Sequence, residues 1–256
     1  MDEALMKRAA LVSIYAAILM LASWAPSTGE SAGILEVGRF SQASVGEVLP
    51  EGWKPLTFKK VPRHTDYRLV QDGDRVVIKA TSAASASGLI KVVSIDSQQY
   101  PIVRWSWRVE NILQKSDVTR KAGDDYPARL YITFAYEPER VSIGRKLKYK
   151  AGRALFGDIP IAALNYIWES KAPVGTIVDN AFTDFAKMIV VQSGAERLGS
   201  WVEEERNVYE DYKAAFGEQP PMINGIAIMS DTDNTGEQAL AYYGDIVFAK
   251  TGGQRD

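Results

Sequence analysis

The sequence contains no cysteine and a single histidine, His64. Without cysteine the chain can form no disulfide, no thiolate metal site, no cysteine nucleophile and no lipoprotein anchor on an N-terminal cysteine. A zinc site with several histidine ligands is excluded, and a Ser-His-Asp triad would have to use His64. The lack of cysteine fits either the cytosol or an export route that does without disulfides.

Other common signatures are missing as well. The sequence has no Walker loop, no Rossmann glycine fingerprint and no Gly-x-Ser-x-Gly elbow, so we expect neither nucleotide-dependent nor α/β-hydrolase chemistry. Its 30 basic and 32 acidic residues give a formal net charge of −2. A nucleic-acid-binding domain normally carries a basic excess, so no nucleic-acid partner is expected.

The N-terminus has the order of a secretory signal peptide. Lys7 and Arg8 precede an apolar run from Ala9 to Ala22, and a stretch of small residues follows from Ser23 to Gly33. The apolar run is shorter than the ~20 residues that span a bilayer as a helix. We expect residues 1–32 to be a signal peptide and short spacer, leaving a periplasmic or secreted protein with no integral membrane span after cleavage. The alternatives are an uncleaved anchor or a buried N-terminal helix.

After residue 33 the sequence reads as strands. Short β-branched and aromatic runs recur between turn signals, which is typical of a sandwich or barrel. The clearest hairpin has strands at 67–71 and 75–81, joined by Asp72-Gly73-Asp74. Further strands are predicted at 56–61, 88–95, 102–109, 129–136, 161–168, 187–192, 223–229 and 241–248.

Two helices are indicated. Ser200 and Glu203 form a capping box, a stripe of apolar residues continues to Phe216, and Gly217 suits a C-cap. A second helical piece is indicated at 143–155, and it overlaps a segment (139–153) that holds six basic residues and one acid. That segment is either a solvated surface insertion or a patch for an anionic ligand or membrane headgroups.

No repeat or linker interrupts the chain after residue 33, so residues 33–256 are predicted to form one domain. We predict a mainly β fold: an antiparallel two-sheet β-sandwich of jelly-roll type with one or two short helices.

The segment Ile102–Val109 alternates, with Trp105 and Trp107 on one face and Arg104, Ser106 and Arg108 on the other. The two tryptophans either belong to the core or form a platform for a flat ligand such as a sugar ring. Similarly, Asn165 and Glu169 share one face of the predicted strand at 161–168, and either could line a binding cleft.

The segment Asp231–Glu237 is rich in oxygen ligands and contains Gly236. It resembles the start of a calcium loop, which would use Asp231, Asp233 and Thr235 as ligands. The match is partial, because Thr235 replaces an Asp/Asn and position twelve is Tyr242 instead of Glu. The alternatives are a polar ligand-binding loop, with Asn234 among its contacts, or a plain turn between strands.

Asp124 and Asp125 precede the predicted strand that begins near Arg129. Paired carboxylates can act as general acid and base if they face each other across a substrate. Sequence neighbours point in different directions, so a pairing of Asp125 with Asp231 or Asp233 is more sensible. The alternative is a charged loop with an ion pair to Arg129.

Several motifs occur in the order found in one bacterial family, the domain of unknown function 3047, which this chain resembles over about residues 45 to 249. The resemblance implies an export signal and one domain, and it implies no activity and no catalytic residues. It also implies that the two Asp-rich segments are shared features. The motifs are Trp105-Ser106-Trp107, Gly123-Asp124-Asp125, Arg129, Tyr166-Ile167-Trp168, Gly199-Ser200-Trp201, Asp211-Tyr212, Phe216-Gly217 and Asp231-Thr232-Asp233-Asn234-Thr235-Gly236.

Three functions remain open. The favoured hypothesis is an exported module that binds a carbohydrate or another cell-envelope ligand, with calcium as a bridging ion. The second is a carboxylate-dependent polysaccharide hydrolase or lyase. The third is an envelope scaffold that binds another protein. Beyond the tryptophans and the Asp-rich segments, Arg129 and Glu169 are predicted to contact the ligand.

Overall fold

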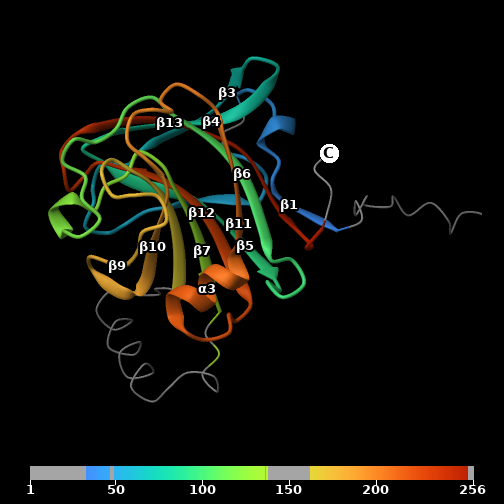
Figure 1. Ribbon diagram of the computed structural model, residues 1–256. Coiled ribbons are helices and arrows are strands. Elements are labelled where there is room, and N and C mark those ends of the chain that lie inside the picture. The colour runs from blue at the N-terminus through green and yellow to red at the C-terminus, as the bar shows by residue number, and fades with distance from the viewer. Residues whose placement is uncertain (1–32, 47–48, 136, 138–161, 253–256) are drawn as a thin grey trace, which may run out of the picture. The chain divides into compact units, whose positions relative to one another are not determined.

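The computed structural model describes residues 33–46, 49–135, 137 and 162–252, and their strands form two sheets packed face to face (Figure 1). Neighbour by neighbour, the six-stranded sheet contains β11 (Val202–Asn207), β6 (Ile102–Val109), β13 (Gln238–Ala249), β4 (Arg75–Ala83) and β3 (Asp66–Asp72), with β1 (Ile34–Gly38) also paired to β13. The seven-stranded sheet contains β2 (Trp53–Leu56), β5 (Ala86–Ile95), β12 (Ile223–Asp231), β7 (Arg129–Phe134), β8 (Ala162–Glu169), β10 (Thr183–Ser193) and β9 (Ile177–Asn180).

The predicted two-sheet β-sandwich is confirmed. One pair departs from the antiparallel pattern, because β8 and β10 run parallel. The hairpin of β3 and β4 is also confirmed, and Gly73 in its turn has a φ of 62°, which glycine adopts without steric cost. The strand predicted at 56–61 lies earlier, at Trp53–Leu56, because the buried Trp53 ring packs edge-on against Phe40.

Aromatic residues fill the space between the sheets. The inward face of β6 presents Trp105 and Trp107, and the inward face of β8 presents Tyr166 and Trp168. Trp105 stacks on Tyr166 with ring centroids 5.3 Å apart, and Trp107 lies 6.1 Å from Trp168. Burial of each large apolar side chain stabilises the fold by about 1.5–3 kcal/mol, so these strands form the centre of the core.

The helix near the C-terminus is shorter than the sequence predicts. Residues Val202–Asn207 form the edge strand β11, paired with β6, and the helix α3 covers only Val208–Phe216. Asn207, not Ser200, is the N-cap, and its side chain accepts from the Glu210 amide. Gly217 closes the helix with a φ of 72°, as predicted. The capping-box prediction is wrong because β6 offers a free edge, and pairing with a distant strand outweighs local helix signals.

The outer face of the seven-stranded sheet is covered at one end by the long loop between β6 and β7. Ile167 of β8 and Met188 and Val190 of β10 point outward and pack against Val118 and Tyr126 of that loop. This second apolar cluster holds the loop on the sheet, and the loop carries Asp124 and Asp125.

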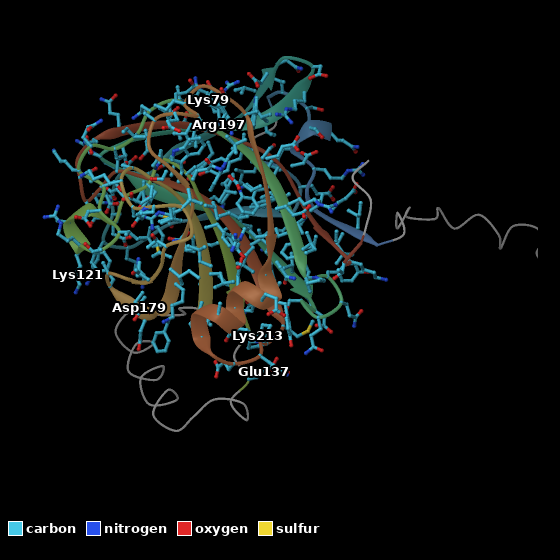
Figure 2. All side chains as sticks on the ribbon, viewed as in Figure 1. Lys79, Lys121, Glu137, Asp179, Arg197 and Lys213 are labelled. Atoms are coloured by element: carbon cyan, nitrogen blue, oxygen red, sulfur yellow. The ribbon has the colours of Figure 1, made fainter. Side chains whose placement is uncertain are left out.

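Several predictions fall outside the described residues: the signal peptide at 1–32, the helical piece at 143–155 and the basic segment at 139–153. Among the helices of the described residues, none has the length and apolar character of a transmembrane span. Charges of both signs, including Lys121, Asp179, Arg197 and Lys213, lie at the outside of the sandwich (Figure 2).

Candidate functional site

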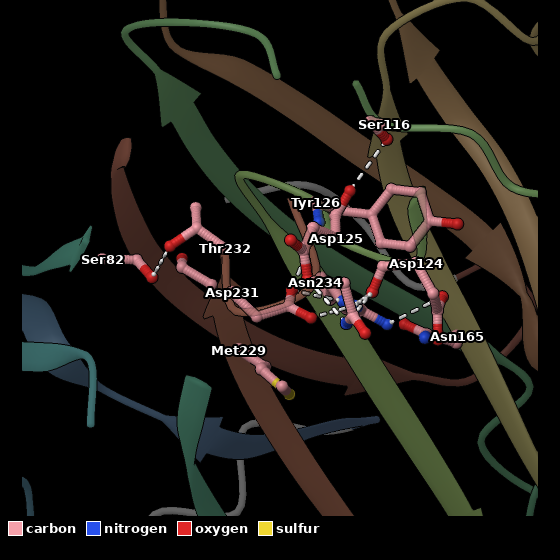
Figure 3. A network of polar contacts seen from close by, with 12 residues as sticks. Ser82, Ser116, Asp124, Asp125, Tyr126, Asn165, Met229, Asp231, Thr232 and Asn234 are labelled. Atoms are coloured by element: carbon pink, nitrogen blue, oxygen red, sulfur yellow. Dashed lines mark hydrogen bonds and ion pairs between the residues drawn. The ribbon is translucent and has the colours of Figure 1, made fainter. Parts of the chain in front are cut away.

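Two Asp-rich loops meet at one end of the seven-stranded sheet. One precedes β7 and the other joins β12 to β13. The backbone N–H of Tyr126 donates to Asp231 Oδ1 at 3.2 Å, and the Asp231 N–H donates to the Tyr126 carbonyl at 3.2 Å. Asp125 Oδ2 accepts from the Thr235 N–H at 2.6 Å, and its Oδ1 accepts from the Asn234 amide at 3.0 Å (Figure 3). These contacts assemble the acidic cluster, which we define as Asp124, Asp125, Asp231 and Asp233.

Arg129 lies at the centre of the acidic cluster. It is the first residue of β7 and is in register with Met229 of β12, so Asp231 falls two residues further along the same outer face. Arg129 Nε donates to Asp231 Oδ1 at 2.7 Å, and its Nη2 donates to the other Asp231 oxygen and to the Asp124 carbonyl. The side chains of Arg129 and Asp231 are only 3% and 2% exposed, so their ion pair is buried.

The surroundings of Asp231 oppose its ionisation, except for Arg129. Burial raises the pKa of Asp231 to about 8; Arg129 opposes that rise, and the negative charges of Asp125 and Asp124 add to it. Burial also raises the pKa of Asp124 and of Asp233, and repulsion from Asp125 adds to both. Burial is the largest cause of all three shifts, and the charge imbalance of four carboxylates near one guanidinium adds to it.

Three of these carboxylates are close enough to hold a cation. One oxygen each of Asp125, Asp231 and Asp233 lies within 4.8 Å of the other two. The sequence predicted Asp125 beside Asp231 or Asp233, and that is where it lies. Thr235, the third predicted calcium ligand, uses its hydroxyl to accept from the Glu237 N–H at 3.3 Å. Oxygen ligands of this type suit a hard cation such as Ca²⁺.

The β12–β13 loop is anchored from several sides. The Thr232 hydroxyl hydrogen-bonds the Ser82 hydroxyl at 2.8 Å, and both are buried. The carboxylate of Glu237 accepts from the Gln114 and Lys115 N–H groups, which ties the loop to the β6–β7 loop. Gly236 adopts a φ of 70°. Asp233 and Asn234 are therefore exposed at the tip of a loop whose base is fixed.

Asp124 connects the acidic cluster to further polar side chains on the outer face of the sheet. Asp124 Oδ2 accepts from the Asn180 amide at 2.8 Å, and its Oδ1 lies 3.6 Å from Arg129 Nη1. Arg129 Nη1 donates instead to the Tyr131 hydroxyl at 3.1 Å, and the guanidinium lies over the Tyr126 ring at 4.4 Å. The sequence allowed a charged loop with an ion pair to Arg129, and Asp124 forms that ion pair at the long distance of 3.6 Å.

The predicted tryptophan platform is wrong. Trp105 and Trp107 are 3% and 0% exposed, because their strand turns this face toward the opposite sheet. Neither ring face is open to a ligand, and the core interpretation holds. Glu169 is 1% exposed and accepts from the backbone N–H groups of Lys171 and Ala172, so its carboxylate is engaged by the turn that follows β8.

Some residues of the site were not indicated by any pattern in the sequence. Asn180 is in a four-residue edge strand without a clear alternating pattern, and Tyr126 follows the Gly123-Asp124-Asp125 motif without being part of it. The Ser82 and Thr232 contact joins segments 150 residues apart. A signal did exist for Tyr131, which follows Arg129 by two residues in an alternating strand and therefore shares its face.

A comparison with protein families places the chain in a family of unknown function. Residues 51–247 match the family described as "Protein of unknown function (DUF3047)". No curated protein matches the chain.

Three solved structures are weakly similar. The family 11 carbohydrate-binding module of cellulase Lic26A-Cel5E of Clostridium thermocellum has a TM-score of 0.41 and 8% identity, covering 85% of this chain and 95% of that one. The K2 adhesin domain of Lys-gingipain has a TM-score of 0.39 and 10% identity, covering 84% and 99%. The family 30 carbohydrate-binding module of Clostridium thermocellum Cel9D-Cel44B has a TM-score of 0.36 and 10% identity, covering 86% and 99%.

These likenesses are too low to support a conclusion about ligand or reaction. The family match is of a different kind, because it spans most of the described sandwich, from β2 into β13, and includes both Asp-rich loops. The chain therefore belongs to the DUF3047 family of proteins of unknown function.

Proposed function

We propose that this domain binds a hydroxyl-rich ligand, a glycan or a similar component of the cell envelope, at the tip of the β12–β13 loop. One observation carries the proposal: Asp233 and Asn234 are exposed on a loop that buried contacts hold in place. Carboxylates accept hydrogen bonds from sugar hydroxyls, and an amide both donates and accepts. Because the loop is already ordered, little conformational entropy is lost when a ligand binds.

Calcium forms part of the proposal. The crowded carboxylates of Asp125, Asp231 and Asp233 repel one another, and a divalent cation would offset that repulsion. A cation at this place would also lie next to the exposed Asp233 and Asn234, where it can coordinate ligand hydroxyls. We also propose that the protein is exported, because the signal-like segment at 1–32 would bring the domain to the cell envelope.

Binding is favoured over hydrolysis by the way the acids are engaged. A general acid must reach the proton acceptor on its substrate. Asp231 has the raised pKa that an acid needs, yet it is 2% exposed and both of its oxygens accept from Arg129. Asp125 is fully buried, and its two oxygens accept from the adjacent loop.

The test is an array of bacterial and plant glycans probed with the protein in calcium and in EDTA. We expect binding to a subset of glycans, weakened at least tenfold by Asp233→Asn and reduced in EDTA. Asp74→Asn is the matched control, because Asp74 is also an exposed turn aspartate but belongs to the β3–β4 hairpin. Absence of binding to every glycan would overturn the proposal and direct attention to a protein partner. Binding that is equal in EDTA would remove calcium from it.

A further inference from the structure

Two buried polar atoms beside the acidic cluster have no hydrogen-bond partner. They are Asn165 Oδ1 and the Tyr126 hydroxyl, and both residues are 0% exposed. An unpaired buried polar group costs about 1–3 kcal/mol, so native proteins rarely retain one without a use for it. Two such atoms near one cluster therefore require a physical explanation.

The environment of Asn165 is polar but poorly paired. Asn165 points outward from the middle of β8, between its register partners Tyr131 on β7 and Met188 on β10. Its Nδ2 donates only to the Met188 thioether at 3.3 Å, which is a weak acceptor. The Asn180 amide lies 3.6 Å from the same sulfur.

Asn165 is linked to Asp124 through Met188 and Asn180. The Asn180 amide that approaches the Met188 sulfur also donates to Asp124 Oδ2 at 2.8 Å. The contact between Asp124 Oδ1 and Arg129 Nη1 is 3.6 Å, too long for a good hydrogen bond. This part of the sheet thus has a free carbonyl acceptor on Asn165, and the amide nitrogen of the same side chain is held only by a sulfur.

We propose that Asp124, Asn165 and Asn180 form a subsite for a single sugar residue, with the half-buried Tyr131 ring beside it as the stacking surface. A sugar presents adjacent hydroxyls that both donate and accept, which matches the alternating carboxylate and amide groups. An aromatic ring packs against the apolar face of a sugar. Because Asn165 is fully buried, the half-buried Asn180 amide must leave the Met188 sulfur and turn toward the sugar as the sugar enters.

This subsite rests on the proposed function, since it takes the ligand to be a glycan. The two sites are contiguous, because the Asn234 amide is within 3.4 Å of the Asp124 carbonyl. A glycan bound by Asp233 and Asn234 would therefore reach Asp124 with a neighbouring sugar. The subsite extends the proposed function from a loop tip to an extended surface of the seven-stranded sheet.

The experiment titrates the ¹⁵N-labelled protein with glucose, galactose, mannose and N-acetylglucosamine and follows the side-chain amide signals of Asn165 and Asn180. We expect at least one sugar to shift both signals. Asn165→Leu should abolish that shift at Asn180 and weaken binding of the array glycans at least tenfold. It should also raise the melting temperature by about 2–4 °C, because it removes an unpaired polar atom at nearly constant volume.

Two further variants keep the test decisive. Asn180→Ala, at the end of edge strand β9, should weaken the same glycans even if Asn165→Leu fails to fold. Asn224→Leu is the control, since Asn224 is exposed on β12 and bonded to the Thr133 hydroxyl, and it should leave binding unchanged. Binding that depends on Asp233 but is unaltered by Asn165→Leu and Asn180→Ala would overturn the subsite and leave the proposed function standing. The absence of any glycan binding would overturn both.

Discussion

Two of the arginine–aspartate pairs in the described part of the chain have similar geometry but different surroundings. Arg206 donates to both oxygens of Asp211 at 2.9 and 2.6 Å, and the Tyr166 hydroxyl donates to one of them at 2.8 Å. Arg129 likewise donates to both oxygens of Asp231. The first pair is balanced in charge and partly exposed, whereas the second is buried among further carboxylates. Paired geometry alone therefore does not mark a site, whereas uncompensated charge around the pair does.

Removing the arginine should separate the two pairs most strongly. Arg129→Met leaves Asp231 and its neighbours buried without a cation, so we expect a loss of about 3–5 kcal/mol in the free energy of unfolding. Arg206→Met should cost less, about 1–2 kcal/mol, because the Arg206 side chain is 36% exposed and water can replace it. Urea unfolding of both variants measures the difference. Equal losses would contradict the contrast between the pairs.

The pH dependence of stability should sharpen the same contrast. Because the pKa of Asp231 is raised to about 8 in the folded state, the folded protein binds more protons than the unfolded chain between about pH 4 and pH 8. Stability should therefore be highest below about pH 4 as far as this group is concerned, and it should fall as pH rises toward 8.

Urea unfolding in EDTA across this range tests the sign, with Arg206→Met as a reference variant that keeps the acidic cluster intact. We expect the wild-type slope to persist in that variant. Stability that rises through this window in both proteins would show that Arg129 keeps Asp231 ionised throughout.

The rigid loop that presents Asp233 offers a smaller effect. Gly236 has a φ of 70°, a conformation that costs other residues about 1–2 kcal/mol. Gly236→Ala should lower the free energy of unfolding by about that amount and weaken glycan binding, because the loop tip loses its fixed shape. Gly73→Ala, at a φ of 62° in the β3–β4 turn, is a matched control for the strain. It should destabilise similarly and leave binding unchanged.

Local patterns in the sequence carried much of the fold and part of the site. The alternation of Ile102–Val109 and the turn at Gly73 are local features, and both strands formed where they were predicted. The start of α3 could not be predicted in the same way, because β11 exists only through its pairing with β6. The face of β6 that turns inward was equally undetermined, since it depends on where the second sheet lies.

The acidic cluster was likewise predictable only in part from the sequence. Carboxylate chemistry picked out Asp125, Asp231 and Asp233, and the register of β7 with β12 brings their loops together. Sequence could not reveal that Arg129 would engage Asp231 in place of a ligand. Nor could it reveal the unpaired carbonyl of Asn165, because an unsatisfied atom is defined by every neighbour that fails to reach it.

The smallest expected change in stability belongs to Asp233. Its carboxylate is exposed and lies near Asp125 and Asp231, so Asp233→Asn removes repulsion without breaking an anchoring contact of the loop. We expect the free energy of unfolding to stay within about 0.5 kcal/mol of the wild type, with any change being a gain. Glycan binding should nevertheless fall at least tenfold. A residue that weakens the fold slightly and supports binding is one retained for its ligand, whereas a marked loss of stability in Asp233→Asn would make Asp233 a structural part of the loop.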